Sequence, residues 1–132
     1  MKKIGILHAQ LSRVIASMGH HDMLVIGDAG LPVPPGVETV DLALIEGVPG
    51  FLETVEAVLR ELHVEEAIID VEQEQISPQM YEQFTAMWPK DIPLRKVPHA
   101  ELQEIVKQAR AVVRTGEFTP YSNIVLVAGV LF

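Results

Sequence analysis

A few polar residues in glycine- and proline-punctuated turns are the candidates for chemistry in this 132-residue chain. His20 follows Gly19, Asp28 opens Asp-Ala-Gly-Leu-Pro, and Tyr121 and Asn123 lie in Thr-Pro-Tyr-Ser-Asn. An imidazole titrates near neutral pH, so His20 can both donate and accept a proton. Tyr offers an apolar face and a hydroxyl, and Asn offers two donors and an acceptor. Together they suit a ligand with both hydroxyls and C–H patches, such as a sugar.

Each of these residues also has an ordinary structural explanation. Asp28 could cap its own turn by accepting backbone N–H groups, as aspartate often does. His20 could pair with the last carbonyls of a preceding helix. His99, which follows Pro98, could be a surface residue at the start of a helix. The residue types alone leave these alternatives open.

Apolar runs and helical spacings predict the elements that hold these residues. Strands are expected over 23–27, 37–44, 67–71, 92–97, 111–114 and 124–130, and helices over 8–18, 51–62, 77–87 and from 98 onward. Ser77 is expected to cap a helix, and Gly19 to end one in the left-handed conformation. Helices that alternate with buried strands predict a three-layer α/β/α sandwich with a largely parallel, about six-stranded sheet, formed by one domain over residues 1–132.

The strand over 23–27 separates two of the candidates. Asp28 follows its carboxyl end, where ligands bind in open α/β sheets. His20 precedes the same strand. At roughly 3.3 Å per residue, the two side chains would lie about 15–25 Å apart in one chain. Both could contact one sugar only if they came from different copies, or if the segment 20–22 folded back.

Composition excludes several classes of protein. There is no cysteine, which excludes disulfides, thiol nucleophiles and zinc ribbons. A formal net charge of −8 argues against a nucleic-acid partner. The longest apolar run, 124–132, is about half of a membrane span, and the apolar run 4–7 is too short for a secretory signal. We therefore expect a cytoplasmic protein without a membrane partner.

Two further expectations come from composition and motifs. Apolar residues make up 48% of the chain, which favours burial of some surface against other copies of itself. No glycine-rich nucleotide-binding motif is present. His20, His21 and Asp22 invite a metal site, but adjacent residues cannot easily face one ion, and neither cysteine nor a Glu-x-x-His motif accompanies them. No metal or cofactor is expected.

Three motifs carry a resemblance to a known family: Gly-His-x-Asp at 19–22, Asp-Ala-Gly-Leu-Pro at 28–32, and Arg-Thr-Gly-Glu-Phe-Thr-Pro-Tyr-Ser-Asn at 114–123. Over its whole length the chain resembles the D-ribose pyranases of bacterial ribose-uptake operons, which are related to L-fucose mutarotases. The resemblance implies a cofactor-free enzyme that assembles as a homodecameric ring with active sites between subunits. The implied site consists of the proton donor His20 and the substrate-binding residues Asp28, His99, Tyr121, Ser122 and Asn123.

Some positions depart from the family or keep no clear role. His21 occupies a position that is small or Thr in the family, which leaves open which imidazole carries the acid/base role. Arg114 and Glu117 are interpreted as structural partners inside the third motif.

The activity that the resemblance implies is interconversion of the β-pyranose and β-furanose forms of D-ribose. Acid/base-catalysed ring opening and reclosure would supply ribose for phosphorylation after uptake. The alternatives are an L-fucose-type mutarotase, or a non-catalytic sugar-binding accessory of a ribose transporter. Loss of exchange without loss of affinity in His20→Ala would distinguish an enzyme from a binding protein.

Overall fold

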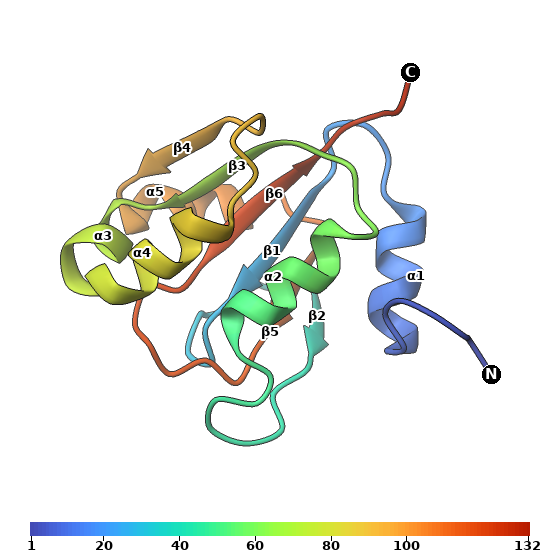
Figure 1. Cartoon of the computed structure of the whole chain (residues 1–132), viewed down its shortest axis with the longest axis horizontal. Coiled ribbons are helices and arrows are strands. Elements are labelled where there is room, and N and C mark those ends of the chain that lie inside the picture. The colour runs from blue at the N-terminus through green and yellow to red at the C-terminus, as the bar shows by residue number, and fades with distance from the viewer.

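Six strands form one sheet in the order β2-β5-β1-β6-β3-β4 in the computed structural model, which describes all residues from 1 to 132 (Figure 1). The strands are β1 Met23–Gly27, β2 Glu38–Asp41, β3 Val64–Asp70, β4 Leu94–Val97, β5 Ala111–Arg114 and β6 Ile124–Ala128. All pairings are parallel except those of β6, which runs antiparallel to both β1 and β3.

Helices cover both faces of this sheet, as the sequence predicted. The helices are α1 Ala9–Ser17, α2 Phe51–Leu59, α3 Val71–Ile76, α4 Pro78–Met87 and α5 His99–Val106. Figure 1 shows α2 and α4 in front of the sheet and α5 behind it. The larger core packs α1, α2 and α4 against one face, and a smaller core packs α5 against the other. The three-layer α/β/α sandwich is confirmed.

The central strand β1 shows why these residues form this fold. Leu24 and Ile26 point into the larger core, and Val25 points into the smaller one. All three are fully buried, because a strand covered by helices on both sides must be apolar on both sides. This rigid centre fixes the positions of the two turns that flank it.

One edge of the sheet gathers several polar residues from distant parts of the chain. The parallel strands β1, β3, β4 and β5 all end at this edge, and the antiparallel strand β6 begins there. The residues at or just beyond those strand ends are Asp28, Asp70, His99, Thr115 and Asn123. This is the edge at which an α/β sheet binds ligands.

Several local predictions were wrong. Strand β3 begins at Val64 and ends before Val71, which is the first residue of α3. That helix was not predicted because six residues are too few to show a helical period. Gly19 does not adopt the left-handed conformation; His21 does, with φ 71°. Ser77 is the N-cap residue of α4 as expected, but its hydroxyl forms no cap hydrogen bond and donates to the carbonyl of Pro120 instead. Strands β2 and β6 are shorter than expected.

None of the helices is both long enough and apolar enough to cross a membrane.

Candidate active site

A cavity of about 570 Å³ opens at the edge where the parallel strands end. Four of the six predicted site residues line it, although up to 95 positions separate them in the chain. Its lining consists of Asp28, Ala29, Gly30, Leu31, Pro32, His99, Arg114, Glu117, Phe118, Pro120, Tyr121 and Asn123. The volume is within the range of small-molecule sites.

Asp28 lies in the wall of this cavity, directly after β1. Burial raises the pKa of its carboxyl group, and backbone hydrogen bonds from Gly30 and Leu31 oppose that rise. Oδ1 accepts the backbone N–H of Gly30 at 3.0 Å. A partly desolvated carboxylate in a cleft binds hydroxyl donors more strongly than one in water. The carboxylate therefore suits recognition of a polyhydroxylated ligand.

Gly27 allows Asn123 to approach the start of this turn. The backbone N–H of Asp28 donates to Oδ1 of Asn123 at 3.1 Å. A Cβ atom at Gly27 would lie 2.6 Å from Cδ2 of Leu31 and 3.1 Å from Oδ1 of Asn123. A residue without a side chain is needed here because both neighbours pack against the backbone.

His99 and Tyr121 form the aromatic part of the wall. Their rings meet edge to face with centroids 5.1 Å apart, an arrangement that aromatic rings favour. The backbone N–H of His99, the first residue of α5, donates to Oε2 of Glu72 at 3.0 Å. Tyr121 adopts φ 61°, which is unusual for a residue with a side chain. Such backbone conformations cluster at functional sites.

Asp70 was not among the predicted site residues, yet it contacts two of them. Its side chain is fully buried at the end of β3. Oδ1 lies 2.9 Å from Nδ1 of His99, and Oδ2 accepts from Nδ2 of Asn123 at 2.8 Å. Burial raises the pKa of Asp70, and the hydrogen bonds from Asn123 and His99 oppose that rise. The signal that could have found it is an acid at the carboxyl end of a strand, the same signal that identified Asp28.

The short helix α3 supports the loop that carries Tyr121. Gln73 donates from Nε2 to the carbonyl of Tyr121 at 3.2 Å, and Ser77 donates to the carbonyl of Pro120 at 2.7 Å. Both side chains are buried. The segment that follows Asp70 therefore holds this loop through hydrogen bonds to its backbone carbonyls.

Arg114 and Glu117 do not pair with each other. Arg114 donates from Nε to the carbonyl of Ala29 at 3.0 Å, and its Nη1 lies 3.1 Å from Asp41. Glu117 accepts the backbone N–H of Phe51, the first residue of α2, at 3.1 Å. Each thus ties a separate loop to the cavity wall.

Ser122 lies outside the cavity lining. Its side chain is fully buried, and Oγ has no hydrogen-bond partner.

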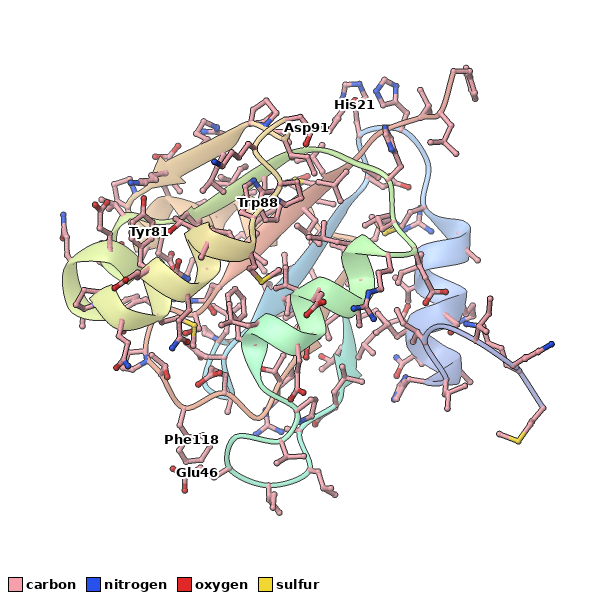
Figure 2. The ribbon with its side chains drawn as sticks, in the orientation of Figure 1. His21, Glu46, Tyr81, Trp88, Asp91 and Phe118 are labelled. Carbon is pink, nitrogen blue, oxygen red and sulfur yellow. The ribbon has the colours of Figure 1, made fainter.

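His20 lies at the opposite edge of the sheet, where β1 begins and β6 ends. The backbone N–H of the next residue, His21, donates to the carbonyl of Ala128 at 2.9 Å. Figure 2 shows His21 at one end of the sheet and Phe118, which lines the cavity, at the other. The structure therefore does not bring His20 to the other predicted site residues within one chain.

The surroundings of His20 correct one argument from the sequence. Nε2 of His20 lies 3.0 Å from Oε2 of Glu65, and Nε2 of His21 lies 3.9 Å from Oε1. One ligand atom from each of the three side chains lies within 4.8 Å of the others. Adjacent histidines can therefore face one point here, contrary to the expectation, because His21 adopts a positive φ. All three residues are exposed.

The fold and the cavity define a small-molecule-binding α/β sandwich whose polar groups match hydroxyls. The chain belongs to the RbsD / FucU transport protein family, whose model matches residues 1–131. It is 52% identical to the D-ribose pyranase of Laribacter hongkongensis, with both chains covered completely. The structure of Bacillus subtilis RbsD complexed with D-ribose matches with a TM-score of 0.93 and 44% identity, again over the whole of both chains.

A more distant structure shares the fold. The fucose mutarotase of Streptococcus pneumoniae, in complex with L-fucose, matches with a TM-score of 0.72 at 20% identity over 94% of each chain.

Proposed function

We propose that this protein is a D-ribose pyranase that interconverts the β-pyranose and β-furanose forms of D-ribose. The observation that carries the proposal is the convergence of Asp28, His99, Tyr121 and Asn123 in one cavity. Full-length relatives at about half identity that are named D-ribose pyranases support the choice of reaction. The L-fucose-type alternative has weaker support, since the fucose mutarotase is only 20% identical.

The reaction needs two proton transfers and no cofactor. A base removes the proton of the anomeric hydroxyl while an acid protonates the ring oxygen, and the hemiacetal opens to the aldehyde. Rotation about a carbon–carbon bond presents a different hydroxyl to the carbonyl, and the reverse transfers close the other ring. His20 is assigned the acid/base role, because an imidazole can both give and take a proton near neutral pH. The four cavity residues hold the sugar, and Ser122 is part of the loop that carries two of them.

His20 must then come from another copy of the chain. Exposed apolar side chains at both edges of the sheet support such a contact. Beside the cavity these are Leu44, Ile45, Val48 and Phe118, and beyond the end of β6 they are Leu131 and Phe132. Two different surfaces that pair head to tail generate a ring when the rotation closes. The proposed assembly is a homodecameric ring with active sites between subunits.

The proposed place of this activity is the cytoplasm, after ribose uptake. There, the furanose form would be delivered to a phosphorylating enzyme.

Saturation-transfer NMR of D-ribose tests the function directly. Saturating one pyranose resonance should reduce the matching furanose resonance only when the protein is present, and a chelator should leave this transfer unchanged. Activity that chelator abolishes and a divalent ion restores would contradict the metal-free reaction, in which case His20, His21 and Glu65 would be the first ligands to test. Binding of ribose without any exchange would favour a sugar-binding accessory, and L-fucose as a second sugar tests the other alternative.

A further inference from the structure

Asp70 is a fully buried carboxylate that does not line the cavity but contacts two residues that do. Its two oxygens are used separately: one faces Nδ1 of His99 and the other faces Nδ2 of Asn123. Ionised charges are almost never fully buried unless they are paired or hydrogen-bonded. A carboxylate in this place therefore needs both contacts, and the two contacted side chains are constrained in return.

The hydrogen-bond chain fixes which atom donates at each step. The backbone N–H of Asp28 can only donate, so the atom of Asn123 that faces it must be the carbonyl oxygen. The amide nitrogen of Asn123 then faces Asp70 as a donor. The second oxygen of Asp70 accepts from Nδ1 of His99, which must carry a proton to donate.

The other nitrogen of His99 completes this assignment. In a neutral ring with a proton on Nδ1, Nε2 is an acceptor. Nε2 lies 3.1 Å from Nε2 of Gln103, whose amide nitrogen can only donate. The contact with Asp70 and this orientation of Gln103 thus agree on the same tautomer.

We propose that Asp70 is a positioning residue that holds His99 in the Nδ1–H tautomer and Asn123 in one amide orientation. Nε2 of His99 is then the acceptor of the ring, and a sugar hydroxyl would replace the amide of Gln103 at its single lone pair, while Asn123 is held with its oxygen toward Asp28. The identity of the ligand rests on the proposed function; the tautomer and the amide orientation follow from the hydrogen bonds alone. Asp70 orients two groups that contact the sugar and does not itself reach it.

The substitution Asp70→Asn tests this assignment without a change in volume. His99 and Asn123 face different oxygens of Asp70. The new amide has an oxygen at only one of these two positions and an NH₂ group at the other, so it cannot accept from both side chains. A flip of Asn123 would turn its NH₂ group toward the N–H of Asp28, which places two donors face to face. The remaining way to satisfy the network is a proton shift in His99 from Nδ1 to Nε2, with the amide of Gln103 turned so that its oxygen faces the new N–H.

A second exchange restores the network. In the double variant Asp70→Asn, Asn123→Asp, the new carboxylate at position 123 accepts from the N–H of Asp28 and from the new amide at position 70. The oxygen of that amide then accepts from Nδ1–H of His99. The carboxylate now lies at position 123 in place of position 70, and every donor again has an acceptor.

Nitrogen NMR of the intact protein, labelled at histidine, reads the tautomer directly. His99→Asn assigns the signals. Wild-type protein should show Nδ1 of His99 protonated and Nε2 unprotonated, Asp70→Asn should reverse this, and the double variant should restore it. Gln103→Ala, which removes the other neighbour, should leave Nδ1 protonated. Exchange activity of Asp70→Asn should fall about 10- to 100-fold, as when the carboxylate partner of a metal-binding histidine is removed, mainly through KM because a sugar contact is lost.

Two results would overturn the inference. The first is an Nε2–H tautomer of His99 in the wild-type protein, which needs no variant to fold. The second is an Asp70→Asn protein that folds and keeps the wild-type tautomer. A wild-type protein with the expected tautomer but no effect on ribose exchange would refute the proposed function and leave the role of Asp70 intact.

Discussion

Mixing two inactive variants tests whether each active site is shared between copies of the chain. His20 and Asp28 flank β1, whose five residues span about 16 Å, and two more residues separate His20 from the strand. A pentose is much shorter than that span. His20→Ala and Asp28→Ala subunits should therefore each be inactive alone and active together.

The expected recovery of exchange activity follows from the fraction of sites that contain both intact residues. In a random assembly of equal amounts, a cavity keeps Asp28 half of the time, and the neighbouring copy supplies an intact His20 half of the time. About one quarter of the sites should then contain both residues, which predicts about one quarter of wild-type activity at equal total protein. A site built within one chain predicts no recovery at all.

A reciprocal mixture serves as the control. Wild-type subunits mixed with the double variant His20→Ala, Asp28→Ala should show about one quarter of full activity if sites are shared, and about one half if each chain holds its own site. The two subunits carry different affinity tags, so that sequential purification isolates mixed assemblies before ribose exchange is measured. If mixed assemblies form and the two single variants restore nothing, the shared site is wrong, and the segment around His20 must rearrange within one chain.

Two other predictions concern single residues of the site. His20→Ala should lose exchange activity about 10²- to 10⁴-fold, the usual contribution of a general acid or base. His21→Asn should lose far less, and asparagine tolerates the left-handed backbone of that position. Equal or reversed losses, measured by NMR exchange, would assign the role to His21. For Asp28, burial raises the folded-state pKa above its ordinary 3.8, so the native state favours the protonated acid, and this contribution to stability is present below pH 3.8 and lost as the pH rises through the folded-state pKa. Urea unfolding at pH 4 and pH 7 should therefore show Asp28→Asn gaining stability relative to wild type as the pH rises, and a difference that is independent of pH would contradict this.

Much of the fold could be predicted because the strong signals are local. The central strand β1 is one uninterrupted apolar run between a helix and a turn, so both of its ends were predicted correctly. The edge strand β4 and the helices α4 and α5 follow from proline positions and helical spacing. The short helix α3 has neither signal. Its position depends on tertiary contacts, such as the hydrogen bond from Gln73 to the loop of Tyr121.

The site residues also could be predicted only where the sequence carries a local signal. Asp28, His99, Tyr121 and Asn123 were named as site residues because each lies beside the end of a strand or helix and the family resemblance implies a sugar contact for each. Asp70 was missed because its strand was expected to continue to Val71, which made the acid part of a buried run. The error at Gly19, where the left-handed residue is His21 instead, has a physical reason as well. The chain reverses at His21, where the backbone bonds to β6, and not at the glycine.

The two halves of the proposed site differ in how the chain holds them. The sugar-binding half is built on buried groups: Asp70 and Asn123 are almost completely inaccessible, and their hydrogen bonds connect β1, β3, β6 and α5. The acid/base half, His20, is exposed and is held by one hydrogen bond to Glu65. Affinity for the sugar would then be a property of the folded chain, while turnover would require the assembly. If a contact between copies joins the halves, as proposed, selection for activity would act on the subunit interface as well as on the cavity.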